Sequence, residues 1–205
     1  ISDDPVERAG RKAAFAFLAF AEWIEAQTRA FDIDSVFLLS REGPFLEEVI
    51  RRSALSLPAK VLEVSRVSTF MPSMPDFTVE SMMRMWERFP LQSPASMLAG
   101  LGLERTSFDL LLDRFDREPS KEIHEPWNDS RVKSFLRSNE FVEQATHAQD
   151  EAKALLLCYL KQQGYLDAVS VAMVDVGWRG TIQDSLARLV PAVYSTGLLM
   201  AHRPA

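Results

Sequence analysis

The sequence of 205 residues contains a single cysteine, Cys158, so a disulfide within the chain is impossible. Its thiol lies in the apolar segment "ALLLCYL", a context that predicts a buried and unreactive side chain. The absence of disulfides fits a reducing compartment, and we expect a cytoplasmic location. His124, His147 and His202 are scattered without the spacing of metal ligands, so we expect no structural zinc site.

Basic residues are in the minority. The chain has 23 lysines and arginines against 29 aspartates and glutamates, which gives a formal net charge of -6. General binding of nucleic acid or of an anionic membrane surface requires a broad positive field, which this balance does not provide. We therefore expect no nucleic-acid partner, and any site for an anion must be a local arrangement of side chains.

Long hydrophobic runs are also missing. The longest, "AAFAFLAFA" at residues 13–21, is well short of the roughly 20 residues that a membrane-spanning helix needs, so we expect a core helix there and no transmembrane segment. Asp3, Asp4 and Glu7 stand where a signal peptide carries positive charge. The chain begins at Ile1 rather than Met and ends just after a predicted strand, so we expect it to be part of a longer protein.

Short apolar segments, each followed by a helical pattern, predict the fold class. A parallel sheet covered on both faces is typical of such a pattern, and we predict an α/β fold with a mostly parallel sheet and flanking helices. A hydrophobic content of 47% is sufficient for one good core. The predicted strands are residues 35–40, 60–65, 169–176 and 192–201, and the predicted helices of this core are 5–30, 44–55 and 181–189.

A long segment between the second and third strands has almost only helical signals. We predict that residues 78–164 form a large helical insertion, and that residues 1–77 and 165–205 form the α/β core. Thr78, Ser93 and Thr106 are expected helix N-caps, and Gly164 is an expected terminator. The predicted helices of the insertion are residues 78–89, 93–101, 106–115, 130–137 and 140–163.

Every predicted strand is followed within a few residues by an arginine. Because the carboxyl ends of parallel strands meet at one edge of a sheet, these side chains are expected to emerge together, where ligands of open α/β sheets bind. A guanidinium group matches phosphate oxygens in a bidentate manner, so the pattern predicts an oxyanion pocket. The alternative is that the arginines solvate loops or pair with acids such as Glu42 and Asp76. The four arginines are Arg41, Arg66, Arg179 and Arg203.

The segment "VAMVDVGWRGTIQDSL", residues 171–186, combines a carboxylate with a glycine-containing turn. A strand that ends in Asp175 and turns through Gly177 and Gly180 into a helix near Thr181 presents backbone N–H groups and the positive helix end to one point. That point suits a phosphate, while Asp175 could hold sugar hydroxyls or a magnesium ion. Trp178 could stack on a sugar ring or pack against the insertion. The alternative is that Asp175 caps the helix and the glycines serve only the turn.

Three segments resemble a known family. "VDVGWRGTIQ", together with "VFLLSREGPFLEEV" and "VLEVSR", is similar to a bacterial polysaccharide-locus family whose members often carry a haloacid-dehalogenase-type hydrolase domain ahead of this region. The resemblance covers the strand–loop units and little of the helical segment. The hydrolase's own signature, a DxD nucleophile motif directly after an early strand, is not visible in this sequence, so the hydrolase activity would belong to a neighbouring domain of the same protein.

The same segments distantly resemble the phosphoribosyltransferase fold. The resemblance implies that Asp175, here followed by Val176 instead of a second acid, holds the ribose hydroxyls. It also implies two phosphate-binding loops. The pyrophosphate loop would consist of Ser40, Arg41, Glu42 and Gly43, and the 5-phosphate loop of Gly177, Trp178, Arg179, Gly180 and Thr181.

These observations lead to a prediction of function. We expect a sugar-phosphate-binding transferase module that moves a phosphoribosyl or related sugar from a phosphosugar donor to a glycan acceptor in bacterial surface polysaccharide biosynthesis. Asp175 and Arg41 would be catalytic, Arg66 would bind substrate, and Asp175 would hold Mg²⁺. The alternatives are a non-catalytic docking module for a hydrolase or glycosyltransferase domain, and a phosphatase.

Overall fold

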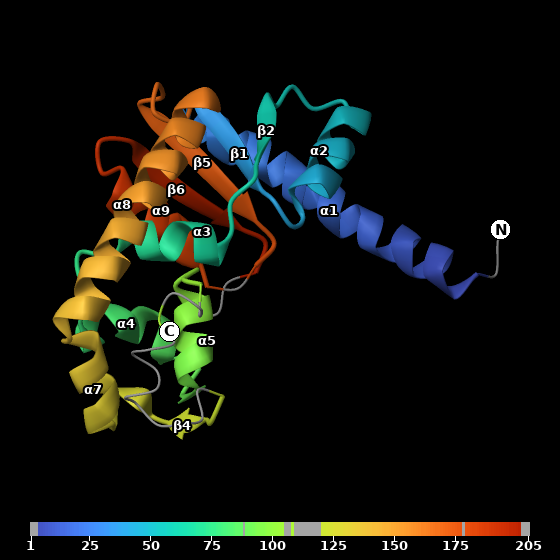
Figure 1. Cartoon of the computed structure of the whole chain (residues 1–205). Coiled ribbons are helices and arrows are strands. Elements are labelled where there is room, and N and C mark those ends of the chain that lie inside the picture. Colours follow the sequence, from blue (N-terminus) through green and yellow to red (C-terminus); the bar gives the residue numbers. More distant parts are fainter. Residues whose placement is uncertain (1–3, 88, 105–107, 109–119, 178, 202–205) are drawn as a thin grey trace. The chain divides into compact units, whose positions relative to one another are not determined.

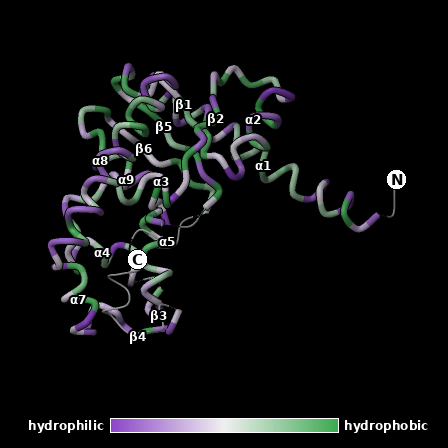
Figure 2. The backbone as a smooth tube through the Cα atoms, viewed as in Figure 1, coloured by the Kyte–Doolittle hydropathy of each residue, from purple (hydrophilic) through white to green (hydrophobic). Residues whose placement is uncertain are grey.

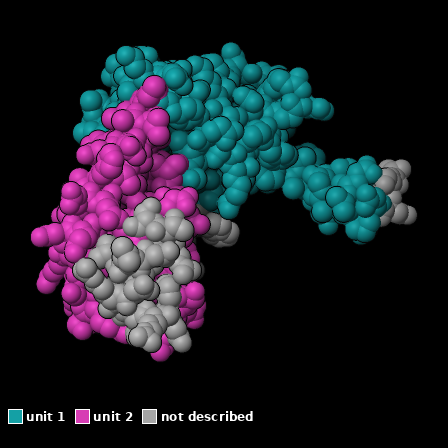
Figure 3. Space-filling model, in the orientation of Figure 1, with its two compact units in different colours: residues 1–65, 159–205 teal, residues 66–158 magenta. Residues whose placement is uncertain are grey.

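The computed structural model describes residues 4–87, 89–104, 108, 120–177 and 179–201 (Figure 1). The chain divides into two compact units, which Figure 3 shows in different colours. The first unit consists of residues 1–65 and 159–205, and the second of residues 66–158. The second unit begins and ends earlier than the predicted insertion 78–164. One reason is that Phe70, Met71 and Met74 are buried in the core of the second unit.

The first unit contains a four-stranded parallel sheet. Its strand order is β2-β1-β5-β6, and every neighbouring pair is parallel. The prediction of an α/β fold with a parallel sheet is confirmed, and each strand is shorter than its predicted segment. The strands are β1 (Ser35–Leu39), β2 (Ala59–Leu62), β5 (Ser170–Asp175) and β6 (Tyr194–Leu199).

Three helices of the first unit cover the two faces of this sheet. Helices α1 (Pro5–Ala30) and α2 (Gly43–Arg52) share a hydrophobic core with alternate residues of the strands, namely Val36, Leu38, Ala172, Val174 and Leu198. Helix α9 (Thr181–Leu189) covers the other face, since its Gln183 lies against Gly197, a register partner of Met173. On that face Tyr165 contacts the Phe37 ring.

The first half of α1 is exposed, in contrast to the predicted core helix. Its N-terminus is well formed, because the Asp4 carboxylate caps the Val6 N–H at 3.0 Å and proline follows in the first turn. Residues 4–16 are nevertheless all exposed, and Figure 2 shows hydrophobic and hydrophilic residues in alternation along this helix. Burial begins only near Phe20 and Ala21, where the helix reaches the sheet.

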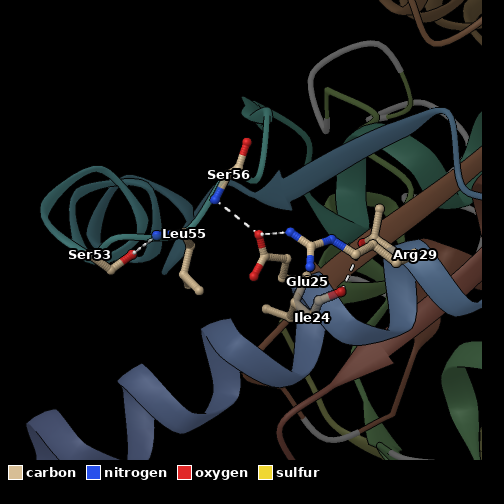
Figure 4. Close-up of polar contacts among 7 residues, drawn as sticks. Ile24, Glu25, Arg29, Ser53, Leu55 and Ser56 are labelled. Carbon is tan, nitrogen blue, oxygen red and sulfur yellow. Dashed lines mark hydrogen bonds and ion pairs between the residues drawn. The ribbon is translucent and has the colours of Figure 1, made fainter.

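The second half of α1 is attached to the loop between α2 and β2. Glu25 is the centre of this contact: its Oε1 atom accepts hydrogen bonds from the Ser56 backbone N–H at 2.9 Å and from Arg29 at 2.8 Å (Figure 4). The Glu25 side chain is only 14% exposed, so this ion pair is better shielded than those of the outer surface. The contact holds α1 against the α2–β2 connection.

The second unit is mainly helical. Thr78 and Ser93 cap their helices as predicted, through hydrogen bonds from the N–H groups of Ser81 and Ser96. A short antiparallel pairing of β3 (Leu91–Gln92) with β4 (Ile123–His124) was not predicted. The predicted helix 106–115 and its Thr106 cap lie outside the described residues, except for Phe108. The helical segments are α3 (Arg66–Phe70), η1 (Met71–Ser73), α4 (Val79–Trp86), α5 (Pro94–Gly100), η3 (Pro126–Asn128), α7 (Ser130–Leu136) and α8 (Asn139–Gln162), whose last four residues belong to the first unit.

Cys158 is exposed on α8, so the prediction of a buried thiol is wrong. The periodicity of the helix explains the difference. Leu156 and Leu160 are four residues apart and are both buried, whereas Cys158 lies between them and faces away. A run of apolar residues in a helix therefore does not bury every member. Among the described residues, every helix falls short of a membrane span in length or in hydrophobicity.

A carboxylate joins the amino ends of the two central strands. The Oδ2 atom of Asp34 accepts hydrogen bonds from the backbone N–H groups of Val169, at 2.9 Å, and Ser170, at 2.8 Å. The Asp34 N–H donates in return to the Ser170 hydroxyl at 3.1 Å. The backbone hydrogen bond from Ser170, with those from Val169 and the Ser170 hydroxyl, lowers the pKa of Asp34 from its ordinary value of 3.8.

This contact predicts a pH dependence of stability. A carboxylate whose pKa is lowered by folding stabilises the protein fully above the unfolded value of 3.8, and the contribution is lost as the pH falls through the lower folded value. We expect Asp34→Asn to remove this contribution. The difference in unfolding free energy between wild type and variant should therefore shrink on acidification, measured by urea denaturation from about pH 7 to about pH 2. A difference that stays constant over this range would contradict the assignment.

Candidate functional site

The carboxyl edge of the parallel sheet contains a topological switch point. From β1 the chain crosses to β2 on one side, while β5 lies on the other side of β1 and continues to β6. Ligands of open α/β sheets bind outside the carboxyl ends of the strands at such a point. The register pairs Leu38 with Val174, which brings the residues that follow, Ser40 and Asp175, to the same edge. The structure thus places the two predicted loops beside each other.

Two side-chain contacts are made by the loop after β1, one to the segment that follows β2 and one within the loop. The Ser40 hydroxyl donates to the Val64 carbonyl at 2.6 Å, which connects the ends of β1 and β2. The Arg41 side chain is 79% exposed, and its Nε atom pairs with Glu42 at 2.6 Å. Arg41 and Glu42 therefore partly neutralise each other. An exposed pair of this kind contributes little to stability, so the arginine remains able to exchange its partner for an anion.

Gly43 serves close packing at the start of α2. A Cβ atom at this position would lie 2.9 Å from the Leu38 carbonyl oxygen and 3.3 Å from the Val61 Cγ1 atom. The glycine therefore allows the first turn of α2 to approach the end of β1. Pro44 follows in the first turn, and no side chain caps this helix. Backbone N–H groups at the N-terminus of α2 are thus free of side-chain capping at the carboxyl edge.

The turn after β5 is built around the Asp175 carboxylate. Its Oδ1 atom accepts the Gly177 N–H at 2.9 Å, so Asp175 stabilises the turn and does not cap the following helix. A Cβ atom on Gly177 would lie only 2.8 Å from the Oδ2 atom of Asp175. Gly180, the N-cap of α9, has a φ of 61°, a left-handed conformation that favours glycine. The backbone conformation thus requires glycine at position 180, whereas Gly177 leaves room for the Asp175 carboxylate.

Within the described part of the chain, no side chain caps the N-terminus of α9 either. Thr181, its first residue, is half-buried, and Arg179 is exposed in the preceding turn. Because α2 and α9 cover opposite faces of the sheet, their N-termini flank the switch point from two sides. The positive ends of two helices at one edge favour an anion there. Trp178 and Arg203 lie outside the described residues.

Arg66 does not directly follow a strand. Strand β2 ends at Leu62, so three residues separate it from Arg66, which begins helix α3 of the second unit. The guanidinium of Arg66 lies over the Phe89 ring, 5.9 Å from its centroid, which is a cation–π contact. The prediction placed Arg66 with the other arginines because it extended the strand to residue 65. Arg66 thus contacts Phe89, an aromatic side chain of the second unit.

The donor atoms at this edge suit only one kind of metal site. The described residues contain no cluster of three potential metal ligands. Asp175 is the residue that the sequence predicts as a metal ligand. Mg²⁺ often takes one or two carboxylates and completes its coordination with water and substrate phosphates. The Oδ2 atom of Asp175 makes no recorded hydrogen bond to a described residue, so this group fits a magnesium ion that arrives with a phosphorylated substrate.

Gln183 is a site residue that the sequence reasoning missed. It lies in the first turn of α9, is 7% exposed, and neither polar atom of its amide has a hydrogen-bond partner among the described residues. A signal was present in the sequence, because Gln183 lies three residues before Leu186 and seven before Val190. A helical face with that spacing is buried, so a polar residue at this position is unusual.

Comparison with known proteins does not assign this site. No protein-family model matches the chain, and no curated protein has a significantly similar sequence. The resemblance to the polysaccharide-locus family therefore stays a prediction.

The close approach at Gly43 leads to a testable expectation. Gly43→Ala should destabilise the protein by about 1–3 kcal/mol, because the added methyl group meets backbone atoms that cannot move easily. Gly10→Ala is the matched control: Gly10 lies in the exposed part of α1 with nothing within 4 Å of the added atom. This variant should gain up to about 1 kcal/mol from helix propensity. Thermal unfolding measures both, and equal stability of Gly43→Ala and wild type would refute the close approach.

Proposed function

We propose that this chain is a sugar-phosphate-binding transferase module, whose donor site lies at the carboxyl ends of β1 and β5. The observation that carries the proposal is the pair of helix N-termini, α2 and α9, that flank the switch point without capping side chains. Backbone N–H groups and helix dipoles form a ready anion site, and a phosphate is the anion that such loops bind most often.

The residues around this point support a transfer reaction on a phosphorylated sugar. Arg41 would exchange Glu42 for a phosphate of the donor, since guanidinium forks bind phosphate oxygens well. Asp175 would use its Oδ2 atom for sugar hydroxyls while its Oδ1 atom keeps the turn in place. A magnesium ion carried by the donor and held by Asp175 would add positive charge next to the phosphates. Catalysis would consist of positioning and of electrostatic stabilisation of the leaving pyrophosphate.

The reaction class follows from the resemblance to phosphoribosyltransferases and is part of the proposal. The donor would be phosphoribosyl pyrophosphate or a related activated sugar, and the acceptor a glycan of the bacterial surface. In this reaction the bond between the anomeric carbon and pyrophosphate breaks, and a bond from that carbon to an acceptor hydroxyl forms. The acceptor proton goes to solvent or to the departing pyrophosphate. A hydrolase or glycosyltransferase domain of the same protein is the proposed partner.

The first half of α1 favours a second candidate, a docking module. Phe15 and Leu18 lie three residues apart, on one face of this helix, and are 78% and 38% exposed. Apolar side chains that remain uncovered can mark a surface for a protein partner. A docking module would bind such a partner and need no phosphosugar, so the experiments on the donor site separate the two functions.

Calorimetric titration with phosphoribosyl pyrophosphate, with and without magnesium, tests the donor site. We expect saturable binding to the wild type, and a loss of about 10-fold or more in affinity for Arg41→Ala, because a charge-assisted contact to phosphate is removed. The melting temperature should not change, since the Arg41 side chain is exposed. Arg51→Ala is the control: Arg51 is an exposed arginine at the other end of α2, and Glu48 keeps its second partner, Arg52. Equal losses in the two variants would contradict the proposal.

Asp175→Asn separates transfer from docking. The Asn side-chain oxygen can still accept the Gly177 N–H, so we expect the wild-type melting profile. Donor-dependent transfer to a glycan acceptor should fall by about 100-fold, because one key electrostatic group is lost. Undiminished transfer would contradict the role of Asp175. If the wild type neither binds nor transfers a phosphosugar, the docking function replaces the transferase.

A further inference from the structure

The buried amide of Gln183 is unusual among the described side chains. Both its Nε2 and its Oε1 atom lack a hydrogen-bond partner, and the described residues show one other such case, the indole nitrogen of Trp86. A primary amide offers two donors and one acceptor oxygen, and nearly all buried groups of this kind are paired in folded proteins. A leucine would fill a similar volume without leaving polar atoms unpaired. The amide therefore calls for a partner that arrives from outside the chain.

The position of this amide connects it to the proposed donor site. If Gly197 of β6 carried a Cβ atom, the Gln183 Cγ atom would lie 3.5 Å from it. A Cβ atom on Gly180 would lie 3.9 Å from the Gln183 Oε1 atom. Gly180 is the N-cap of α9. The Leu199 side chain also lies near Gly180, and Leu199 pairs in register with Asp175. The unpaired amide thus lies directly beside the turn that leads from Asp175 into α9.

We infer that Gln183 is the specificity residue of this site, and that its amide hydrogen-bonds a hydroxyl group of a bound sugar phosphate. This inference rests on the proposed function. A phosphate oxygen only accepts hydrogen bonds, so a phosphate alone would leave the Oε1 atom unpaired. A sugar hydroxyl both donates and accepts, and matches both halves of the amide. The ligand class is therefore a sugar that carries a phosphate, with the phosphate at the N-terminus of α9 and a hydroxyl at Gln183.

A rotation of the side chain would bring the amide to the ligand, in exchange for the packing contacts of its buried position. No hydrogen bond to a described residue holds the amide in its buried position, so a rotation about its side-chain bonds toward the N-terminus breaks none. The ligand then supplies the partners that the folded chain lacks. In the free protein the unpaired amide destabilises the fold, and on binding this penalty is removed. Sites that sacrifice stability for binding in this way are common in proteins.

The test compares two ligands in calorimetric titrations of the full chain, namely ribose 5-phosphate and inorganic pyrophosphate. For Gln183→Leu we expect about 10-fold weaker binding of ribose 5-phosphate, because the hydroxyl loses its partner, and an unchanged affinity for pyrophosphate. The melting temperature of the free variant should rise by about 2–4 °C, since a buried unpaired amide is replaced by an apolar group of similar volume.

Gln149 provides a matched control. Its amide nitrogen donates to the backbone carbonyls of Met71 and Met74, at 2.8 and 2.9 Å, so this glutamine is well paired. Gln149→Leu should lower the melting temperature and leave both affinities unchanged. The opposite directions of the two melting shifts distinguish a glutamine kept for a ligand from one kept for the fold, even where a variant is too unstable for titration.

Three results would overturn the inference. Gln183→Leu could lower the melting temperature and leave binding of ribose 5-phosphate intact, which would indicate a structural role. The variant could bind both ligands with equally reduced affinity, which would indicate an effect on the helix N-terminus as a whole. Wild type could bind pyrophosphate but not ribose 5-phosphate, which would refute Gln183 as a sugar contact and keep the anion site. Absence of binding of either ligand to wild type would instead refute the proposed function itself.

Discussion

The parallel pairing of β1 with β5 is the interaction on which the rest of the first unit depends. It joins segments that are more than a hundred residues apart in the chain, as the contact of Asp34 with Ser170 shows at the amino ends. Closing so long a loop costs conformational entropy, which the buried apolar residues of both strands offset. Once the pair forms, the register brings Ser40 and Asp175 to one edge. The geometry of the candidate site is therefore a consequence of strand pairing and not of local sequence.

The two ends of this strand pair are built differently. At the amino ends, the Oδ2 atom of Asp34 accepts two backbone N–H groups, an arrangement that stabilises the fold. At the carboxyl ends, Gly180 allows a left-handed turn, and the amide of Gln183 has no hydrogen-bond partner among the described residues. A buried amide without a partner costs stability, and it lies at this edge of the sheet. Functional sites commonly have this character, because the surrounding structure holds groups in arrangements that serve a ligand.

The sequence allowed the fold class to be predicted, because its signals are local. The buried strands are short apolar runs. Thr78 and Ser93 cap N–H groups that lie only three residues further along the chain. Features that depend on tertiary packing were missed. The predicted core helix at residues 13–21 is largely exposed because its first part lies beyond the sheet, and Cys158 lies on the outer face of α8. The end of β2 was placed too late, which put Arg66 at the edge.

The candidate site was predicted where strand order and motif coincide. The residues around Asp175 could be recognised because a carboxylate and two glycines adjoin in sequence, and their position at the switch point follows from the parallel order. The role of Gly43 in packing and the unpaired amide of Gln183 could not be derived in this way, because both depend on neighbours from other strands. Close packing and hydrogen-bond satisfaction become visible only when the chain is folded.

The central claim is that the carboxyl edge of β1 and β5 is an anion site, and backbone NMR of the isotope-labelled chain tests it most directly. On titration with inorganic pyrophosphate, we expect saturable shifts of the amide resonances of Arg41, Glu42, Gly177, Gly180 and Thr181, which share one dissociation constant. Amides at the amino ends of the same strands, such as those of Asp34 and Ser170, should not shift. Shifts without saturation, or saturable shifts centred away from the carboxyl edge, would contradict the claim.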